Sequence, residues 1–278
     1  MTWLEALPAK GRRGSLPRCL LLTEGSRAEV AQRLTELISA PEVAITEQDC
    51  WMPRGCPVQS NETWDTAPIQ EAKLGEVEGL LSPAERSNVT RWWLAVTKRA
   101  NTPNWDLAST CTVAGRRGIL LVEAKAHAEE LRKAEAGKGS SGDSANSAAN
   151  HRRIGDAIAS AKAGCERATG VPWGISRDTH YQMSNRCAWS WKLTELGYPV
   201  VLVYLGFLRA QEMQDISAPF ASHAEWEALV KAHSRTLFPG TFWNNPFELN
   251  GQTFMPLIRS LEQPLTLMTR ESHANRHQ

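Results

Sequence analysis

Residues 118–126 constrain the fold most, because this run is apolar on both faces and yet carries two charges near its end. A run of this kind is typical of a central strand that is covered on both sides. Glu123 and Lys125 are two residues apart, so their side chains project from the same face of such a strand. Burying a carboxylate and an ammonium group is costly unless something compensates their charge. The run therefore predicts a buried strand with a polar site at its end.

A second strand-like run ends at Val113 and is joined to the first by Ala-Gly-Arg-Arg, which predicts a β-hairpin. If all four residues form the loop, Val113 pairs with Gly118. Asp106 then lies opposite Lys125 and diagonally across from Glu123 on the same face, at a Cα separation of roughly 7–8 Å. Two carboxylates at that spacing can share a divalent cation, and Mg²⁺ or Mn²⁺ is the expected ion. A slip of one residue would move Asp106 to the other face.

Helical patterns surround this hairpin. Residues 82–98 begin with Ser-Pro-Ala-Glu, a capping signature, and carry an apolar stripe at helical spacing. Further helices are expected at residues 153–168 and 182–196, and the second of these leads into a buried strand at residues 199–207. The order of helix, hairpin, helix and strand predicts an α/β fold with a mixed central sheet and helices on both faces.

We divide the chain into three parts. Residues 1–69 are interpreted as an N-terminal extension packed on the core, residues 70–210 as the core, and residues 211–278 as a C-terminal extension of helices and loops. Within the core, residues 137–150 are rich in Gly, Ser, Ala and Asn, and they contain too few apolar groups to offset the entropy of ordering. We expect a mobile loop there.

Composition narrows the classes of function. The formal net charge is only +1, so any surface that binds nucleic acid must be local. The six cysteines include no Cys-x-x-Cys pair, which argues against a zinc ribbon or an iron–sulfur cluster and indicates reduced thiols. No run approaches the roughly 20 apolar residues that span a bilayer. A cytoplasmic protein without a membrane partner is expected, and the oligomeric state stays open.

The combination Asn104-Trp105-Asp106, with 16 residues separating Asp106 from Glu123 in Val122-Glu123-Ala124-Lys125, resembles the signature of the PD-(D/E)xK, or restriction-endonuclease-like, superfamily. Trp105 stands where the signature has proline. The resemblance covers residues 82–207, somewhat less than half of the chain. It implies a restriction-endonuclease-like core and a nuclease that depends on Mg²⁺ or Mn²⁺, with DNA favoured over RNA as the partner.

The resemblance also implies roles for individual residues. Asp106 and Glu123 would bind the metal, and Lys125 would orient the attacking water or stabilise the charge that develops on phosphorus. Glu85 could supply a third acidic ligand from the first core helix, although a capping box explains it equally well. Gln182 matches by position the polar residue that the helix before the last core strand often contributes.

Several other polar residues are candidates for binding substrate: His127, Asn185, Arg186, Arg152 and Arg153. For each, a structural or solvated position is an open alternative. Two other functions also stay open. The first is a nucleic-acid-binding or regulatory protein that keeps the nuclease fold without cleavage, and the second is a protein that binds small molecules or other proteins and has an incidental acidic cluster.

Overall fold

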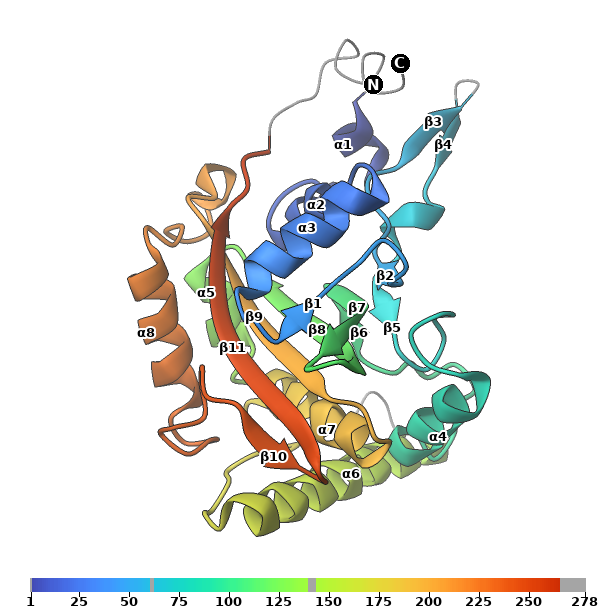
Figure 1. Ribbon diagram of the computed structural model, residues 1–278, viewed down its shortest axis with the longest axis vertical. Coiled ribbons are helices and arrows are strands. Elements are labelled where there is room, and N and C mark those ends of the chain that lie inside the picture. Colours follow the sequence, from blue (N-terminus) through green and yellow to red (C-terminus); the bar gives the residue numbers. More distant parts are fainter. Residues whose placement is uncertain (1, 61–62, 140–143, 266–278) are drawn as a thin grey trace.

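The computed structural model describes residues 2–60, 63–139 and 144–265, and Figure 1 shows their arrangement. The three helices predicted in the core are present, although the first of them stops at Trp93 rather than at residue 98. Within the described residues the helices are α1 (Trp3–Ala6), α2 (Ser15–Leu22), α3 (Arg27–Ile38), α4 (Pro83–Trp93), α5 (Ala128–Lys133), α6 (Ala145–Thr169), α7 (Tyr181–Glu195) and α8 (His223–Ser234).

A curled, mixed sheet forms the centre of the molecule. The strands are β1 (Val43–Ala44), β2 (Trp51–Met52), β3 (Val58–Ser60), β4 (Thr63–Asp65), β5 (Ala72–Lys73), β6 (Asn104–Trp105), β7 (Leu107–Val113), β8 (Arg116–Lys125), β9 (Val200–Leu208), β10 (Phe247–Leu249) and β11 (Gln252–Glu262). In the part of the chain that the structure describes, the main sheet has seven strands in the order β1-β7-β8-β9-β11-β10, and β2 also pairs with β7. The central strands β8, β9 and β11 run parallel, and the other pairs are antiparallel.

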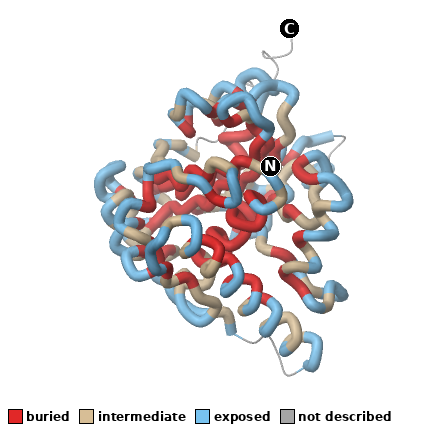
Figure 2. Tube along the Cα trace, turned by 60° about the horizontal axis from the view of Figure 1, so that its bottom comes forward, coloured by how far each residue is buried: buried red, intermediate tan, exposed pale blue. Residues whose placement is uncertain are grey.

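Both faces of the sheet are covered, as the apolar strands predict. Alternate residues of β8 enter two different cores: Leu121 packs with α4, α6, α7 and α8, whereas Leu120 packs with α2 and α3. Figure 1 shows α2 and α3 on one side of the sheet and α6 and α7 on the other. The buried residues lie in the interior in Figure 2, and the outward helix surfaces are exposed. Glu123 shares the face of Leu121, so its side chain points toward α7.

The hairpin turn is shorter than predicted. Val113 pairs with Arg116 rather than Gly118, and only Ala114 and Gly115 form the turn, both with positive φ (47° and 78°). Such a two-residue turn matches the twist of the strands, and glycine adopts its conformation without strain. The expected register is therefore wrong by two residues. An even shift leaves each side chain on its predicted face, so the argument that relates Asp106 to Glu123 survives the correction.

The C-terminal part differs more from the prediction. Residues expected to form only helices and loops include β11, which pairs along most of its length with β9. The expected core boundary at residue 210 therefore does not coincide with the edge of the sheet. In the N-terminal part, α3 covers one face of the sheet, and β1 and β2 pair with β7.

The predicted mobile loop is also partly wrong. Helix α6 begins at Ala145, after Ser144, whose side chain accepts a hydrogen bond from the Ser147 amide. The side chain of Asn150 hydrogen-bonds both the amide and the carbonyl of Val96, at 2.8 Å each, which fixes the start of α6 against the segment after α4. Residues 140–143 of the expected loop lie outside the described residues. Among the helices that the structure describes, none is long and apolar enough to cross a membrane.

Candidate functional site

The end of β8 places Glu123 and Lys125 inside the protein. Their side chains are about 1% and 8% exposed, and the Lys125 Nζ donates a short hydrogen bond to Glu123 Oε1. Burial alone would raise the pKa of Glu123, but Arg186 and Lys125 outweigh that effect and hold the pKa below its usual value. Burial likewise disfavours the charged form of Lys125, yet Glu123 and Asp106 raise its pKa. Both groups are therefore ionised at neutral pH.

Arg186, on α7, holds the second oxygen of Glu123. Its Nε donates to Glu123 Oε2 at 2.6 Å, its Nη1 to Asn185 Oδ1 at 2.9 Å, and its Nη2 to the Asn104 carbonyl at 2.6 Å. The guanidinium also lies 4.4 Å from the ring centroid of Trp105, a cation–π contact. Each nitrogen of the guanidinium thus donates one hydrogen bond, and these contacts make Arg186 a positioning residue for Glu123. Arg186 also lines the cleft beside this pair, and its role in binding substrate stays a prediction.

Asp106 lies just beyond the ladder that joins β7 to β8. Its Oδ2 accepts a hydrogen bond of 2.8 Å from the Ala124 amide, so its carboxylate sits beside the Glu123–Lys125 pair. Burial and the negative charge of Glu123 raise the pKa of Asp106 to about 7, although Lys125 and the Ala124 amide act in the opposite direction. Arg186 and Lys125 thus stabilise the charged form of Glu123, whereas the charged form of Asp106 stays disfavoured.

These residues line a cleft of about 460 Å³. Besides Asp106, Glu123 and Lys125, its walls include Glu71, which sequence reasoning did not find. The short pairing of β5 with β6 sets Ala72 opposite Trp105, and the same register carried one residue further brings Glu71 beside Asp106. Asn104 Nδ2 fixes Glu71 with a 2.8 Å hydrogen bond to Oε2, and the negative charge of Glu71 contributes to the raised pKa of Asp106.

Helix α7 supplies further walls of the cleft. Gln182 and Asn185, both candidates from the sequence, line it, and Gln182 is partly exposed while Asn185 is buried. Lys138 also reaches the cleft and packs 5.1 Å from the ring centroid of Tyr181. Among the described basic residues in and around the predicted loop, Lys138 alone lines the cleft. Trp189 lies in the core beside Trp92 and is not exposed to the cleft.

Two candidate positions lie away from the cleft. Glu85 forms the capping box of α4 with Ser82, and its Oε1 accepts a 2.9 Å hydrogen bond from the Tyr198 hydroxyl. His127 is buried at the start of α5, with Nε2 3.7 Å from a Glu130 oxygen. Neither residue lines the cleft, so the predicted roles of Glu85 as a metal ligand and of His127 in binding substrate are corrected.

Two basic candidates are also placed elsewhere. Arg152 and Arg153 are exposed on α6 and do not line the cleft, so any contact that they make with a nucleic acid lies outside it, and their role in binding substrate stays a prediction. A long helix alternates exposed and buried positions, and Ile154, not its two neighbours, is the residue of this stretch that faces the core. Glu71 carries no local sequence signal, because the strand that positions it is only two residues long.

Comparisons with known proteins give no further guide to the site: no protein-family model, curated protein or solved structure matches this chain.

Proposed function

We propose that this protein is a metal-dependent phosphodiesterase, a nuclease that acts on DNA in preference to RNA and has a restriction-endonuclease-like core. The observation that carries the proposal is the gathering of Asp106, Glu123, Glu71 and Lys125 in the walls of one cleft. Helix α4, the hairpin of β7 and β8, helix α7 and strand β9 follow one another in the order of that core. The preference for DNA rests on the resemblance of the signature alone.

The donor set fits a hard divalent cation. Carboxylate oxygens are the ligands that Mg²⁺ and Mn²⁺ prefer, and a cation with few protein ligands keeps positions for water and phosphate. Asp106 and Glu123 would hold the ion, with Glu71 as the third acidic group in place of Glu85. Although Lys125 and Arg186 each contact Glu123, a carboxylate offers about four acceptor positions, so their bonds leave room for a ligand bond.

The charges of the cleft explain why a cation is needed. Three acidic side chains, Glu71, Asp106 and Glu123, are balanced by the cations Lys125, Lys138 and Arg186. A phosphodiester entering this neutral cleft gains little net attraction from the protein itself. A bound Mg²⁺ would supply the missing positive charge, polarise the phosphoryl oxygen and acidify a water molecule.

Lys125 acts as a cation in this account. Because Glu123 and Asp106 raise its pKa, it stays protonated at neutral pH and cannot serve as a general base. Its Nζ can donate a hydrogen bond to the attacking water or to the charge that develops on phosphorus. Arg186 keeps the Glu123 carboxylate in one orientation, and Gln182, on the same wall, is placed to donate to a phosphate oxygen. Hydrolysis adds water across one P–O bond and releases a phosphate monoester and a hydroxyl end.

The direct test is cleavage of labelled single-stranded DNA, double-stranded DNA and RNA with Mg²⁺, Mn²⁺ or EDTA. We expect cutting that requires metal and falls at least about 100-fold in Lys125→Met and Asp106→Asn proteins, because each removes a charge from the reacting centre. Lys133→Met is the matched control, since Lys133 is exposed at the end of α5 and does not line the cleft.

The outcomes separate the proposal from its rivals. Equal cutting by wild type and by both cleft variants would show that another nuclease contaminates the preparation, and would refute the assignment of this site. Salt-sensitive DNA binding without cleavage under any metal would instead support a nucleic-acid-binding protein that keeps the fold. In that case, the buried contacts among Glu123, Lys125 and Arg186 serve stability alone.

A further inference from the structure

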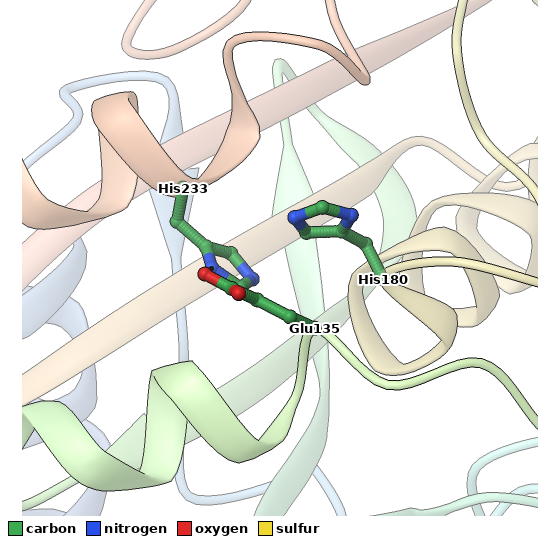
Figure 3. Close-up of side chains that lie close together, drawn as sticks. All are labelled: Glu135, His180 and His233. Atoms are coloured by element: carbon green, nitrogen blue, oxygen red, sulfur yellow. Dashed lines mark ion pairs between the residues drawn. The ribbon is translucent and has the colours of Figure 1, made fainter.

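A second group of metal-binding side chains lies outside the cleft. Glu135 follows α5, His180 precedes α7, and His233 lies near the end of α8 (Figure 3). One possible ligand atom from each residue falls within 4.8 Å of the other two. The imidazole rings of His180 and His233 meet edge to face, with centroids 4.8 Å apart, and the Glu135 carboxylate lies 3.5 Å from His233 Nδ1.

Two ring nitrogens of this cluster are buried without a hydrogen-bond partner among the described residues. His233 has a side chain only about 5% exposed, yet its buried Nε2 has no hydrogen-bond partner among the described residues. The buried Nδ1 of His180 has none there either. Leaving a buried polar atom without a partner is costly, so two such nitrogens in one small cluster need an explanation. A cation bound to imidazole would supply it.

The backbone already holds two of the three residues in register. The His180 amide donates to the Glu135 carbonyl at 2.8 Å, and the Tyr181 amide donates to the Ala136 carbonyl at 3.2 Å. His180 also has a left-handed backbone, with φ of 46°. This conformation is uncommon for a residue other than glycine, and the surrounding contacts must maintain it. Backbone hydrogen bonds therefore fix the relative positions of Glu135 and His180, in addition to the side-chain rotamers.

We propose that Glu135, His180 and His233 form a site for a divalent transition metal, with Zn²⁺ as the best match, separate from the acidic site in the cleft. Two imidazoles and one carboxylate suit Zn²⁺, whereas Mg²⁺ prefers oxygen ligands alone. Tetrahedral zinc places its ligand atoms roughly 3.3 Å apart, given bonds of about 2.0–2.1 Å. The exposed side chain of Glu135 can move by the remaining distance. A water molecule would complete the four ligands.

The position of the site gives it a structural consequence. It would join the end of α8 to the start of α7, two residues ahead of Gln182 and six ahead of Arg186. A bound ion would therefore restrain the helix that carries the walls of the cleft. This inference does not depend on the protein being a nuclease.

Zinc binding to the metal-free full-length chain tests the proposal. We expect one Zn²⁺ per chain in calorimetry, a rise in the thermal unfolding midpoint, and the visible absorption bands of tetrahedral Co²⁺ when cobalt replaces zinc. The variants Glu135→Gln, His180→Gln and His233→Gln should each weaken binding by about 100-fold or more, since even changes beyond the direct ligands cost 10- to 100-fold. Glu135→Gln keeps the test decisive if a buried histidine variant does not fold, because Glu135 is exposed.

Three controls distinguish this site from other sources of binding. His223→Gln changes a histidine on the same helix, α8, that lies outside the cluster, and it should bind Zn²⁺ like wild type. His273→Gln with His277→Gln removes the two histidines near the C-terminus, and Asp106→Asn disables the cleft. No saturable binding, unchanged affinity in Glu135→Gln, or loss of binding in the Asp106 or His273/His277 proteins alone would each overturn the proposal.

Discussion

Replacing Asp106 with asparagine should stabilise the metal-free protein. The pKa of Asp106 is about 7 in the folded state and 3.8 in the unfolded state, so the folded state binds the proton more tightly. Stability is therefore lost as pH rises from about 4 to about 7, and the ionised Asp106 destabilises the fold above that window. At 1.36 kcal/mol per pKa unit, a difference of about three units amounts to about 4 kcal/mol at pH 8. A neutral asparagine side chain avoids this cost and still offers an oxygen to the Ala124 amide.

Urea unfolding of Asp106→Asn and wild type in EDTA, at pH 8 and pH 5, measures the effect. We expect a gain of about 2–4 kcal/mol at pH 8 that falls by roughly half at pH 5, where Asp106 is protonated in the folded wild type. The neighbouring change Glu123→Gln is the matched control with the opposite sign. It leaves Lys125 and Arg186 buried without their anion, and should destabilise by about 3–5 kcal/mol. A loss of stability in Asp106→Asn at pH 8, or a gain that does not depend on pH, would refute the reasoning.

Three further changes test the fold and the corrected assignments. Glu85→Ala should lower the free energy of unfolding by about 1 kcal/mol, because the capping box and the Tyr198 hydrogen bond are lost, and it should leave metal-dependent cleavage unchanged. A fall in cleavage as large as that of a cleft variant would show that Glu85 belongs to the site. Ala114→Asn should stabilise the protein by about 0.5–1 kcal/mol in thermal unfolding, because asparagine adopts the positive φ of this turn position more readily than alanine does. A lowered unfolding midpoint would contradict the two-residue turn. Gly164→Ala should lower the free energy of unfolding in urea by about 1–3 kcal/mol, because a Cβ there would lie 2.2 Å from Trp191 Nε1. An unchanged urea midpoint would contradict this packing.

The central part of the site was predictable because strand geometry is periodic. Glu123 and Lys125 share a face in any register, and an even error in the hairpin still left Asp106 on that face. Gln182 and Asn185 are three residues apart in a segment that was predicted to be helical, so they share one face of α7. These inferences needed only the local chain and the direction of its side chains.

Other features depend on contacts between distant segments. Glu71 joins the cleft through a two-residue strand, too short to leave a pattern in the sequence. Strand β11 was not predicted, and Pro256 within it is a residue that argues against a central strand. Its carbonyl accepts from the Asn244 amide on the side away from β9, so the N–H that proline lacks is not needed in the pairing with β9. The contact by which Arg186 holds Glu123 could not be predicted either, because the two residues lie 63 positions apart in the sequence.

Locating Mn²⁺ by anomalous scattering in crystals of the full-length protein would test the central claim most directly. The account predicts a peak between the carboxylates of Asp106 and Glu123, at bond lengths of roughly 2.0–2.2 Å to their oxygens, and its absence from Asp106→Asn crystals. A cleft without a peak in saturating Mn²⁺, with Glu123 still bound only by Lys125 and Arg186, would contradict the claim that these carboxylates hold a catalytic cation.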